Sequence, residues 1–203
     1  MITRGATVRV FIALDIPQDA KDVLAETIRQ LRSAIPSGVQ WVDPQGIHLT
    51  LKFLGNVDSS VVNDLLGAMK IASENYHDPK FSLSLTGLGL FPNEKQPRVL
   101  WAGTDGDLDS LTTLQTLVDE ATSRLGFSRE KRPFRPHLTL GRVQDGVPQG
   151  PRRFIGEAVV KTQLPPTPPW EVDTLHLIRS TLTPQGAVYT YLGTVPLQAY
   201  PHG

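Results

Sequence analysis

Cysteine is absent from the 203 residues of the chain. This absence excludes a disulfide framework, a thiol nucleophile, and any metal site or iron–sulfur cluster that thiolates would hold. A net charge is absent as well, because 20 Lys and Arg residues balance 20 Asp and Glu residues. The molecule as a whole therefore has no long-range attraction for a polyanion, and any contact with nucleic acid must come from a local basic cluster.

Long hydrophobic runs are also missing. The apolar run near the start, Val10–Leu14, ends at Asp15, and it is too short for a signal sequence or a membrane span. No later stretch is long enough either. Apolar residues make up 39% of the chain and charged residues 20%, which is typical of a soluble globular protein. We expect a cytoplasmic protein that is a monomer and has no membrane partner.

Histidine is scarce, with five residues in the chain, yet His48 and His137 each open the same tetrapeptide, HLTL. The two copies lie 89 residues apart (137 − 48 = 89). The same offset relates RVFIA at 9–13 to RVLWA at 98–102, and FSL at 81–83 to WEV at 170–172. Three segments agree on one offset without a gap, which indicates an internal duplication.

The local patterns of the two halves agree with a duplication. Alternation predicts a strand at 8–14 and apolar spacing predicts a helix from Pro17 to about Ile35, while the second half repeats this order with a strand at 98–102 and a helix at 107–125. Further predictions are a third helix after Asp58, a hairpin of 81–88 with 97–103, its echo in 170–178 with 187–193, and Pro/Gly-rich connections at 144–151 and 163–169.

This order of elements predicts an α+β fold. We expect one bilobal domain over residues 1–203, with intertwined lobes related by a pseudo-twofold axis. Two antiparallel sheets would flank a central cleft, and the helices would pack outside them.

In each HLTL strand, alternate side chains share a face. His48 and Thr50 should therefore lie on one face with their Cα atoms about 7 Å apart. Leu49, Leu51 and Phe53 should point the other way, into a core. His137 and Thr139 repeat the arrangement, and a pseudo-twofold axis would bring the two copies face to face.

Two facing His-x-Thr pairs suit an in-line displacement at phosphorus. One histidine can act as a base toward water and the other as an acid toward the leaving oxygen, because the unperturbed pKa of histidine is about 6.5. Threonine hydroxyls can donate to the non-bridging oxygens. Two histidines without a carboxylate–histidine helix pattern make a poor zinc site, so no metal is expected.

A single His-x-Thr would be an ordinary pair of strand residues. His176, in another strand-like segment, has Ile178 where the hydroxyl would stand, and it is assigned a structural role. The duplication of the motif favours function for the other two histidines.

The residues HLTLKFLG at 48–55 and RPHLTLGR at 135–142, with RVFIALDIP at 9–17, resemble the two-histidine (2H) phosphoesterases and their HxTx motifs. Within that superfamily, the chain most resembles the RNA 2′,3′-cyclic phosphodiesterases, also named 2′–5′ RNA ligases. The resemblance extends from Arg9 to the strand at 187–193. It implies a bilobal α+β fold, no cofactor, and an RNA-processing hydrolase that converts a terminal 2′,3′-cyclic phosphate to the 2′-phosphate.

The resemblance also implies a role for each site residue. His48 matches the proton donor to the 3′-oxygen, and His137 matches the proton acceptor that activates water. Thr50, Thr139 and Arg142 match the phosphate-binding residues. The residues themselves do not distinguish donor from acceptor, because the two motifs are nearly equivalent.

The position of Arg142 conflicts with regular strand alternation. It lies an odd number of residues from His137, so a regular strand would point it away from the site, although Gly141 could break the alternation. Arg135 has the right parity but precedes Pro136, and Lys52 shares the expected face of His48. Arg135 and Lys52 are therefore the alternative substrate-binding residues.

Candidates for contacts with RNA lie around the second motif. The basic run Arg129–Arg135 leads into His137 and could guide an RNA end, although such runs are usually solvated loops. Among the aromatic residues, Phe91 in a Gly-Leu-Phe-Pro segment is the preferred residue for stacking on a base, because binding residues are often on loops.

Two alternative functions remain open. The same chemistry in reverse would join RNA halves through a 2′–5′ bond, with a 5′-hydroxyl replacing water. A non-catalytic module that binds RNA ends would depend on the basic run instead of the histidines. The expected substrates are RNA ends or small cyclic nucleotides.

Overall fold

The computed structural model describes residues 6–77, 80–183 and 186–197. The elements of the first half are β1 (Thr7–Leu14), α1 (Gln18–Ala34), β2 (Val39–Trp41), η1 (Pro44–Gly46), β3 (Leu49–Asp58), η2 (Ser59–Val61), α2 (Val62–Glu74), β4 (Phe81–Phe91) and β5 (Val99–Gly106). The second half adds α3 (Leu108–Ser123), β6 (His137–Val143), α4 (Gln149–Lys161), β7 (Trp170–Val172), β8 (Thr174–Thr183) and β9 (Gly186–Pro196).

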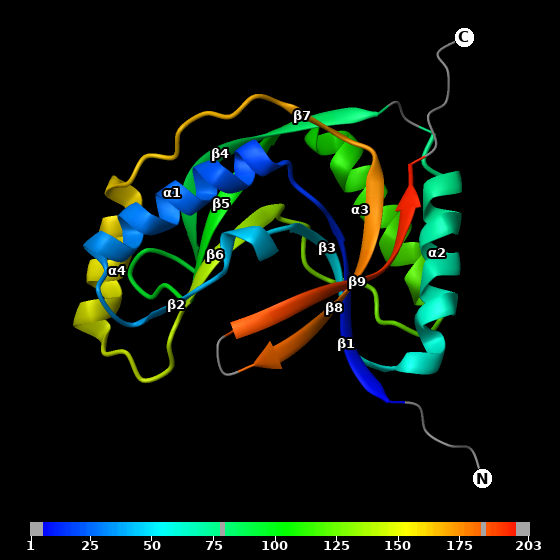
Figure 1. Cartoon of the computed structure of the whole chain (residues 1–203), viewed down its shortest axis with the longest axis horizontal. Coiled ribbons are helices and arrows are strands. Elements are labelled where there is room, and N and C mark those ends of the chain that lie inside the picture. The colour runs from blue at the N-terminus through cyan, green and yellow to red at the C-terminus, as the bar shows by residue number, and fades with distance from the viewer. Residues whose placement is uncertain (1–5, 78–79, 184–185, 198–203) are drawn as a thin grey trace.

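The strands form two antiparallel sheets. One has the order β3-β1-β8-β9, and the other has the order β2-β6-β5-β4-β7. Figure 1 shows the first sheet crossing the centre of the view and the second curving over to the left. This arrangement confirms the predicted α+β fold with two antiparallel sheets.

The two halves of the chain exchange strands. The neighbours β3-β1-β8 in one sheet and β6-β5-β4 in the other occur in the same order under the offset of 89 residues. Strand β4 therefore lies beside β5, while its counterpart β8 lies beside β1. This order agrees with a duplication whose lobes are intertwined.

The sequence pattern predicted one strand over 170–178, but the structure has two strands there. The segment divides at Asp173 into β7, which pairs with β4, and β8, which pairs with β1 and β9. The predicted echo of the first hairpin is therefore formed by β8 and β9 alone.

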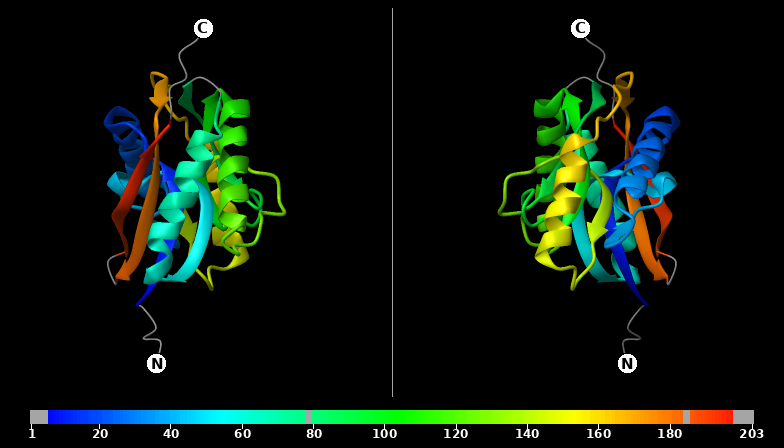
Figure 2. Two further views of the ribbon diagram at one scale, coloured as in Figure 1. Left: turned by 90° about the vertical axis from the view of Figure 1, so that its right-hand side faces the viewer. Right: turned by 90° about the vertical axis from the view of Figure 1, so that its left-hand side faces the viewer.

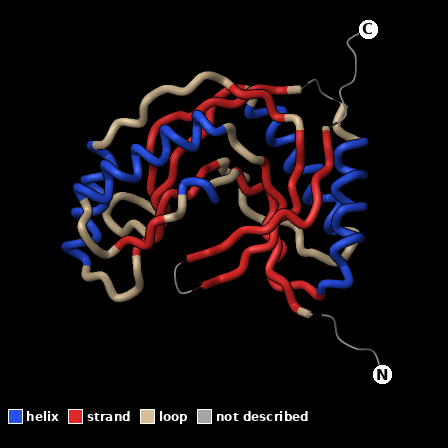
Figure 3. The backbone as a smooth tube through the Cα atoms, in the orientation of Figure 1, coloured by secondary structure: helices blue, strands red, loops and turns tan. Residues whose placement is uncertain are grey.

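Helices cover the outer faces of the sheets, as Figures 2 and 3 show. Helix α1 buries the predicted stripe of Leu24, Ile28 and Leu31. Helices α2 and α3 pack together, with α2 against β8 and β9. Helix α4 packs on β4 and was not predicted; its first residues lie in the segment 144–151, which Pro and Gly had marked as irregular.

A β-bulge follows the threonine of each HLTL strand. Thr50 pairs with Ala13 and Lys52 with Ile12, so Leu51 is an extra residue in β3. In β6, Thr139 pairs with Trp101 and Gly141 with Leu100, so Leu140 is the extra residue. A bulge places two successive side chains on one side and shifts the alternation that follows.

Both motif strands have the same pattern of exposure as a result. The two residues after each threonine are buried, and the third is exposed. The third residue is Phe53 in β3 and Arg142 in β6. The duplicated bulge therefore decides which side chains beyond the threonine face the cleft.

Candidate active site

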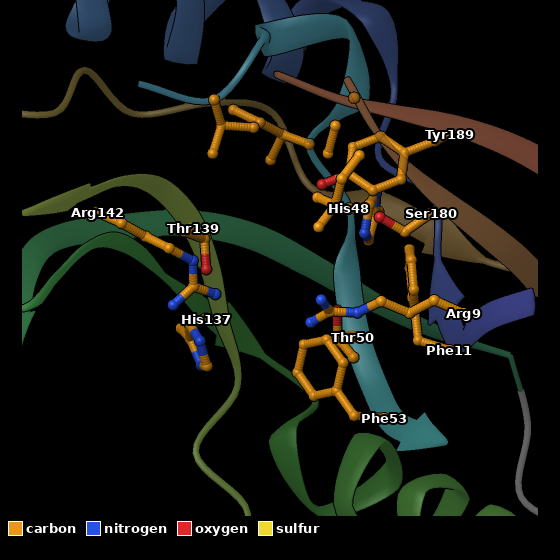
Figure 4. Close-up of a pocket in the computed structure, with 15 residues that line it drawn as sticks. Arg9, Phe11, His48, Thr50, Phe53, His137, Thr139, Arg142, Ser180 and Tyr189 are labelled. Atoms are coloured by element: carbon orange, nitrogen blue, oxygen red, sulfur yellow. The ribbon is translucent and has the colours of Figure 1, made fainter. Parts of the chain in front are cut away.

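A cleft of about 470 Å³ lies between the two sheets. Its lining comprises Arg9, Phe11, Val42, Gly46, Ile47, His48, Thr50, Phe53, His137, Thr139, Arg142, Ser180, Leu182, Ala187 and Tyr189. Figure 4 shows His137, Thr139 and Arg142 on one side, with His48, Thr50 and Arg9 opposite them. This lining contains two arginines and two histidines but no Asp or Glu, so the cleft favours an anion.

His48 lies immediately before β3 and is held by aromatic rings. Its imidazole stacks on Phe11 with 4.5 Å between ring centroids, and the ring of Tyr189 meets it edge-on at 4.9 Å. Burial lowers the pKa of His48 to about 4, while Asp15 and a backbone hydrogen bond to Gly46 act in the opposite direction. His48 is therefore neutral near pH 7 when the cleft is empty.

His137 opens β6 and has a defined tautomer when neutral. Its Nδ1 lies 2.8 Å from the backbone oxygen of Arg135. A carbonyl oxygen only accepts hydrogen bonds, so Nδ1 carries the hydrogen and Nε2 is left without one. Phe91 meets the ring edge-on, with 5.0 Å between centroids. Neutral His137 can therefore accept a proton at Nε2.

The three predicted phosphate-binding residues all line the cleft. Thr50 and Thr139 are half-buried, and each lies two residues after its histidine. Arg142 reaches the cleft because the bulge at Leu140 shifts the alternation of side chains between Thr139 and Arg142 by one residue. The conflict with strand parity is resolved by a bulge centred one residue before the predicted break at Gly141.

The expectation for Lys52 was wrong. Its side chain is buried, with 7% of its surface exposed, and it does not line the cleft. Lys52 Nζ instead pairs with the carboxylate of Asp119 in α3 and donates to the backbone oxygen of Ser128 at 2.6 Å. The bulge at Leu51 turns Lys52 away from the face of His48.

The bulge at Leu51 also turns Phe53 toward the cleft. Sequence alternation had placed Phe53 in the core, but 62% of its surface is exposed and it lines the cleft. Its ring centroid is 6.0 Å from that of Phe11.

Arg135 and Phe91 do not line the cleft directly. The side chain of Arg135 is exposed, and the residue contributes its backbone oxygen to His137. Phe91 ends β4, packs on Trp101 at 5.0 Å and supports the ring of His137. Both residues therefore contact the second motif without facing the ligand space.

Four further residues line the cleft that the sequence did not predict: Arg9, Phe11, Ser180 and Tyr189. Arg9 and Phe11 alternate on β1, so they share a face once the side of that strand is known. Ser180 and Tyr189 are paired across β8 and β9. No local motif marks them, because their position depends on how distant strands pair.

Two further features concern the residues that the structure describes. No group of three or more His, Cys, Asp or Glu side chains in this part of the chain could hold a metal ion. Within the same residues, no helix is both long and apolar enough to cross a membrane.

Two His-x-Thr pairs that face each other across one cleft define a two-histidine phosphoesterase. The sequence matches the family described as LigT like Phosphoesterase over residues 14–101 and 105–189. It is also 32% identical over 185 residues to the RNA 2′,3′-cyclic phosphodiesterase of Methanothermobacter thermautotrophicus, a match that covers 90% of this chain and 95% of that protein. The chain belongs to the LigT-like phosphoesterase family.

Solved structures share the fold. TT0787 of Thermus thermophilus is similar with a TM-score of 0.73 and 28% identity, over 96% of this chain and 100% of that chain. E. coli LigT complexed with 3′-AMP is similar with a TM-score of 0.66 and 25% identity, over 95% of this chain and 99% of that chain.

Proposed function

We propose that this chain hydrolyses the 2′,3′-cyclic phosphate at an RNA end to a 2′-phosphate, by acid–base catalysis between His48 and His137 and without a metal ion. The observation that carries the proposal is the pairing of two His-x-Thr motifs across one cleft whose lining has no carboxylate. The names of the similar proteins support this substrate class, since one is an RNA 2′,3′-cyclic phosphodiesterase.

His137 acts as the base in this proposal. The hydrogen bond from Nδ1 to the backbone oxygen of Arg135 leaves Nε2 free to take a proton from water. The hydroxyls of Thr50 and Thr139 donate to the non-bridging oxygens, and Arg142 adds a fixed positive charge. These donors are aimed at the region where negative charge is held through the displacement.

His48 acts as the acid toward the 3′-oxygen. Because burial lowers its pKa to about 4, it is mostly unprotonated near pH 7 in the empty cleft. A bound cyclic phosphate places a negative charge beside it and therefore raises its pKa. Substrate binding thus supplies the proton-bearing form that the leaving oxygen requires.

We also propose a compartment and an oligomeric state for the enzyme. A chain without cysteine needs no oxidising compartment, which supports a cytoplasmic enzyme. The duplication supplies both His-x-Thr motifs within one chain, so the active unit is proposed to be a monomer.

The test uses an oligoribonucleotide that ends in a 2′,3′-cyclic phosphate. With excess EDTA, the wild type should convert it to the 2′-phosphate product, identified by chromatography against 2′- and 3′-phosphate standards. His48→Ala and His137→Ala should each lose activity. His77→Ala is the matched control, because this exposed histidine follows α2 and lies outside the cleft.

Three results would overturn parts of the proposal. A 3′-phosphate product would contradict the leaving-oxygen assignment. Loss of activity with EDTA would contradict metal independence. RNA binding without turnover, unaffected by the two histidine substitutions, would favour a non-catalytic module. Joined RNA at high end concentration would reveal ligation.

A further inference from the structure

Arg9 is an unpaired cation at the cleft. It is exposed on β1, on the same face as Phe11, and it lines the cleft across from Arg142. Among the described residues, the ion pairs include neither Arg9 nor Arg142. The charges of both arginines also act on Tyr189, where burial raises the pKa and the two arginines lower it by a smaller amount.

The charge of the cleft exceeds that of one cyclic phosphate. A 2′,3′-cyclic phosphate is a diester with a single negative charge. Arg142 lies three residues beyond Thr139 on the same strand, so one permanent cation already serves that end of the cleft. Arg9 is a second permanent cation without a carboxylate partner, and a second phosphate would balance it.

The backbone of Arg9 is displaced along β1 from the residue that pairs with Thr50. Ala13 pairs with Thr50, and Arg9 lies four residues away from Ala13, opposite Asn56. Four residues of extended strand span about 13 Å. Figure 4 shows the side chain of Arg9 directed back over this distance, with its guanidinium beside Phe53 and next to Thr50, so its backbone lies beyond the site of the reacting phosphate and its charge lies at the edge of that site.

An exposed aromatic ring lies next to this arginine. Figure 4 shows Phe53 beside the guanidinium of Arg9, and Phe53 is 62% exposed although it lines the cleft. An exposed ring next to a cation is the arrangement that binds single-stranded nucleic acid, with the base stacked on the ring and the phosphate on the cation. Phe11 separates Phe53 from His48 by contacting both rings.

We propose that Arg9 and Phe53 form a subsite for the nucleotide that precedes the cyclic end of the RNA. Arg9 binds the 3′–5′ phosphodiester that joins this nucleotide to the last one, and Phe53 stacks on its base. The inference rests on the proposed function, and it makes the enzyme selective for RNA chains over cyclic mononucleotides.

The test compares a 2′,3′-cyclic mononucleotide with a dinucleotide that ends in the same cyclic nucleotide. For the wild type, kcat/KM should be at least about tenfold higher for the dinucleotide, because stacking of one base on an aromatic ring strengthens binding by about this factor. Arg9→Ala and Phe53→Leu should each remove most of this preference, because each should lower kcat/KM for the dinucleotide more than for the mononucleotide.

A matched control is provided by the duplication. Arg98 occupies the position equivalent to Arg9 (9 + 89 = 98), is also exposed, and does not line the cleft. Arg98→Ala should keep the preference. Arg9→Ala should also reduce the slope of log kcat/KM against log salt by about 0.7 for the dinucleotide, whereas Arg9→Lys should keep the slope.

Binding of the products separates this inference from the proposed function. A dinucleotide that ends in a 2′-phosphate should bind the wild type more tightly than the mononucleoside 2′-phosphate, and Arg9→Ala should abolish the difference. This measurement needs no turnover, so it tests the subsite even if neither cyclic substrate is hydrolysed. A wild type without a preference would overturn the inference, and so would equal losses on both substrates, because Arg9 would then bind the reacting phosphate.

Discussion

The imidazole of His48 lies nearly parallel to the ring of Phe11, with 4.5 Å between centroids and 19° between the planes. This stacking removes water from one face of the histidine, and the edge of Tyr189 shields it further. Burial is the largest cause of the pKa of about 4. The stacking of Phe11 therefore helps to keep His48, the proposed acid, uncharged in the empty cleft.

We expect two different pH profiles from this environment. The profile of kcat/KM reports the free enzyme and should have a limb near pH 4 that belongs to His48. The profile of kcat reports the enzyme–substrate complex, and the corresponding limb should lie at higher pH because the bound anion favours the imidazolium. Phe11→Ala should move the kcat/KM limb toward 6.5 by hydrating the ring. A wild-type kcat/KM limb already near 6.5 would contradict the burial argument.

Stability should also depend on this histidine. A histidine whose pKa is lower in the folded state binds fewer protons when folded than when unfolded, at every pH between the two values. The free energy of unfolding therefore has its full value above about pH 6.5 and should fall as the pH drops toward 4. His48 should account for at most about 3 kcal/mol of this decrease. Urea unfolding from pH 7 to pH 4 measures the loss. His48→Gln should make the dependence on pH shallower, and an unchanged slope would show that His48 does not cause it.

The roles of the two histidines can be separated with an activated substrate. Each of His48→Ala and His137→Ala should reduce kcat/KM by about 10²–10⁴-fold on the cyclic phosphate. A cyclic diester with a much better leaving group needs little protonation, so it should restore activity to the variant that lacks the acid. We expect rescue of His48→Ala and little effect on His137→Ala. Rescue of His137→Ala alone would exchange the roles.

The pair of Lys52 and Asp119 should stabilise the fold, because it is buried and connects the first motif strand to α3. Asp119 also accepts from the backbone of Glu130 at 3.2 Å, and its pKa is lowered by Lys52 against the effect of burial. Lys52→Met would leave the buried carboxylate with only its longer ion pair, to the half-exposed Arg129 at 3.4 Å, at a cost of up to about 3–5 kcal/mol in the free energy of unfolding. Adding Asp119→Leu should restore much of the loss. Denaturant unfolding of both variants measures this.

An exposed ion pair provides the control for that prediction. Lys80 and Glu171 are joined at 2.6 Å on the surface of the second sheet. Lys80→Met should change the free energy of unfolding much less than Lys52→Met does, because water already solvates both partners. Equal losses in the two lysine variants would mean that the burial of Lys52 has no energetic consequence.

The sequence predicts those features that depend on local periodicity. The stripe of α1 and the two HLTL strands follow from residue spacing, and the repeat of 89 residues predicts two similar halves. The bulge at Leu51 was not predicted, and the bulge at Leu140 was expected only as a break at Gly141, because a bulge depends on the partner strand and leaves no fixed residue pattern. This one omission misplaced both Lys52 and Phe53.

Long-range pairing explains the other differences. Helix α4 begins in a segment rich in Pro and Gly, and its buried face, which includes Ile155 and Val159, packs on a distant strand. Arg9 and Tyr189 are more than 170 residues apart and line the same cleft only because β8 pairs with both β1 and β9. Sequence spacing carries no information about such neighbours unless the sheet order is known.

Gly89 provides a test of how the second histidine is supported. A Cβ atom at this position would overlap the ring of Trp101, which packs on Phe91, and Phe91 in turn contacts His137. Gly89→Ala should therefore push Trp101 aside, lower the free energy of unfolding by about 1–3 kcal/mol, and reduce kcat more than it changes KM. Gly67→Ala is the control, because Gly67 is an exposed residue of α2 with nothing within 4 Å of the added atom. It should stabilise the helix by roughly 0.5–1 kcal/mol and leave kcat unchanged. Wild-type kcat in Gly89→Ala would show that His137 keeps its position without this stack of rings.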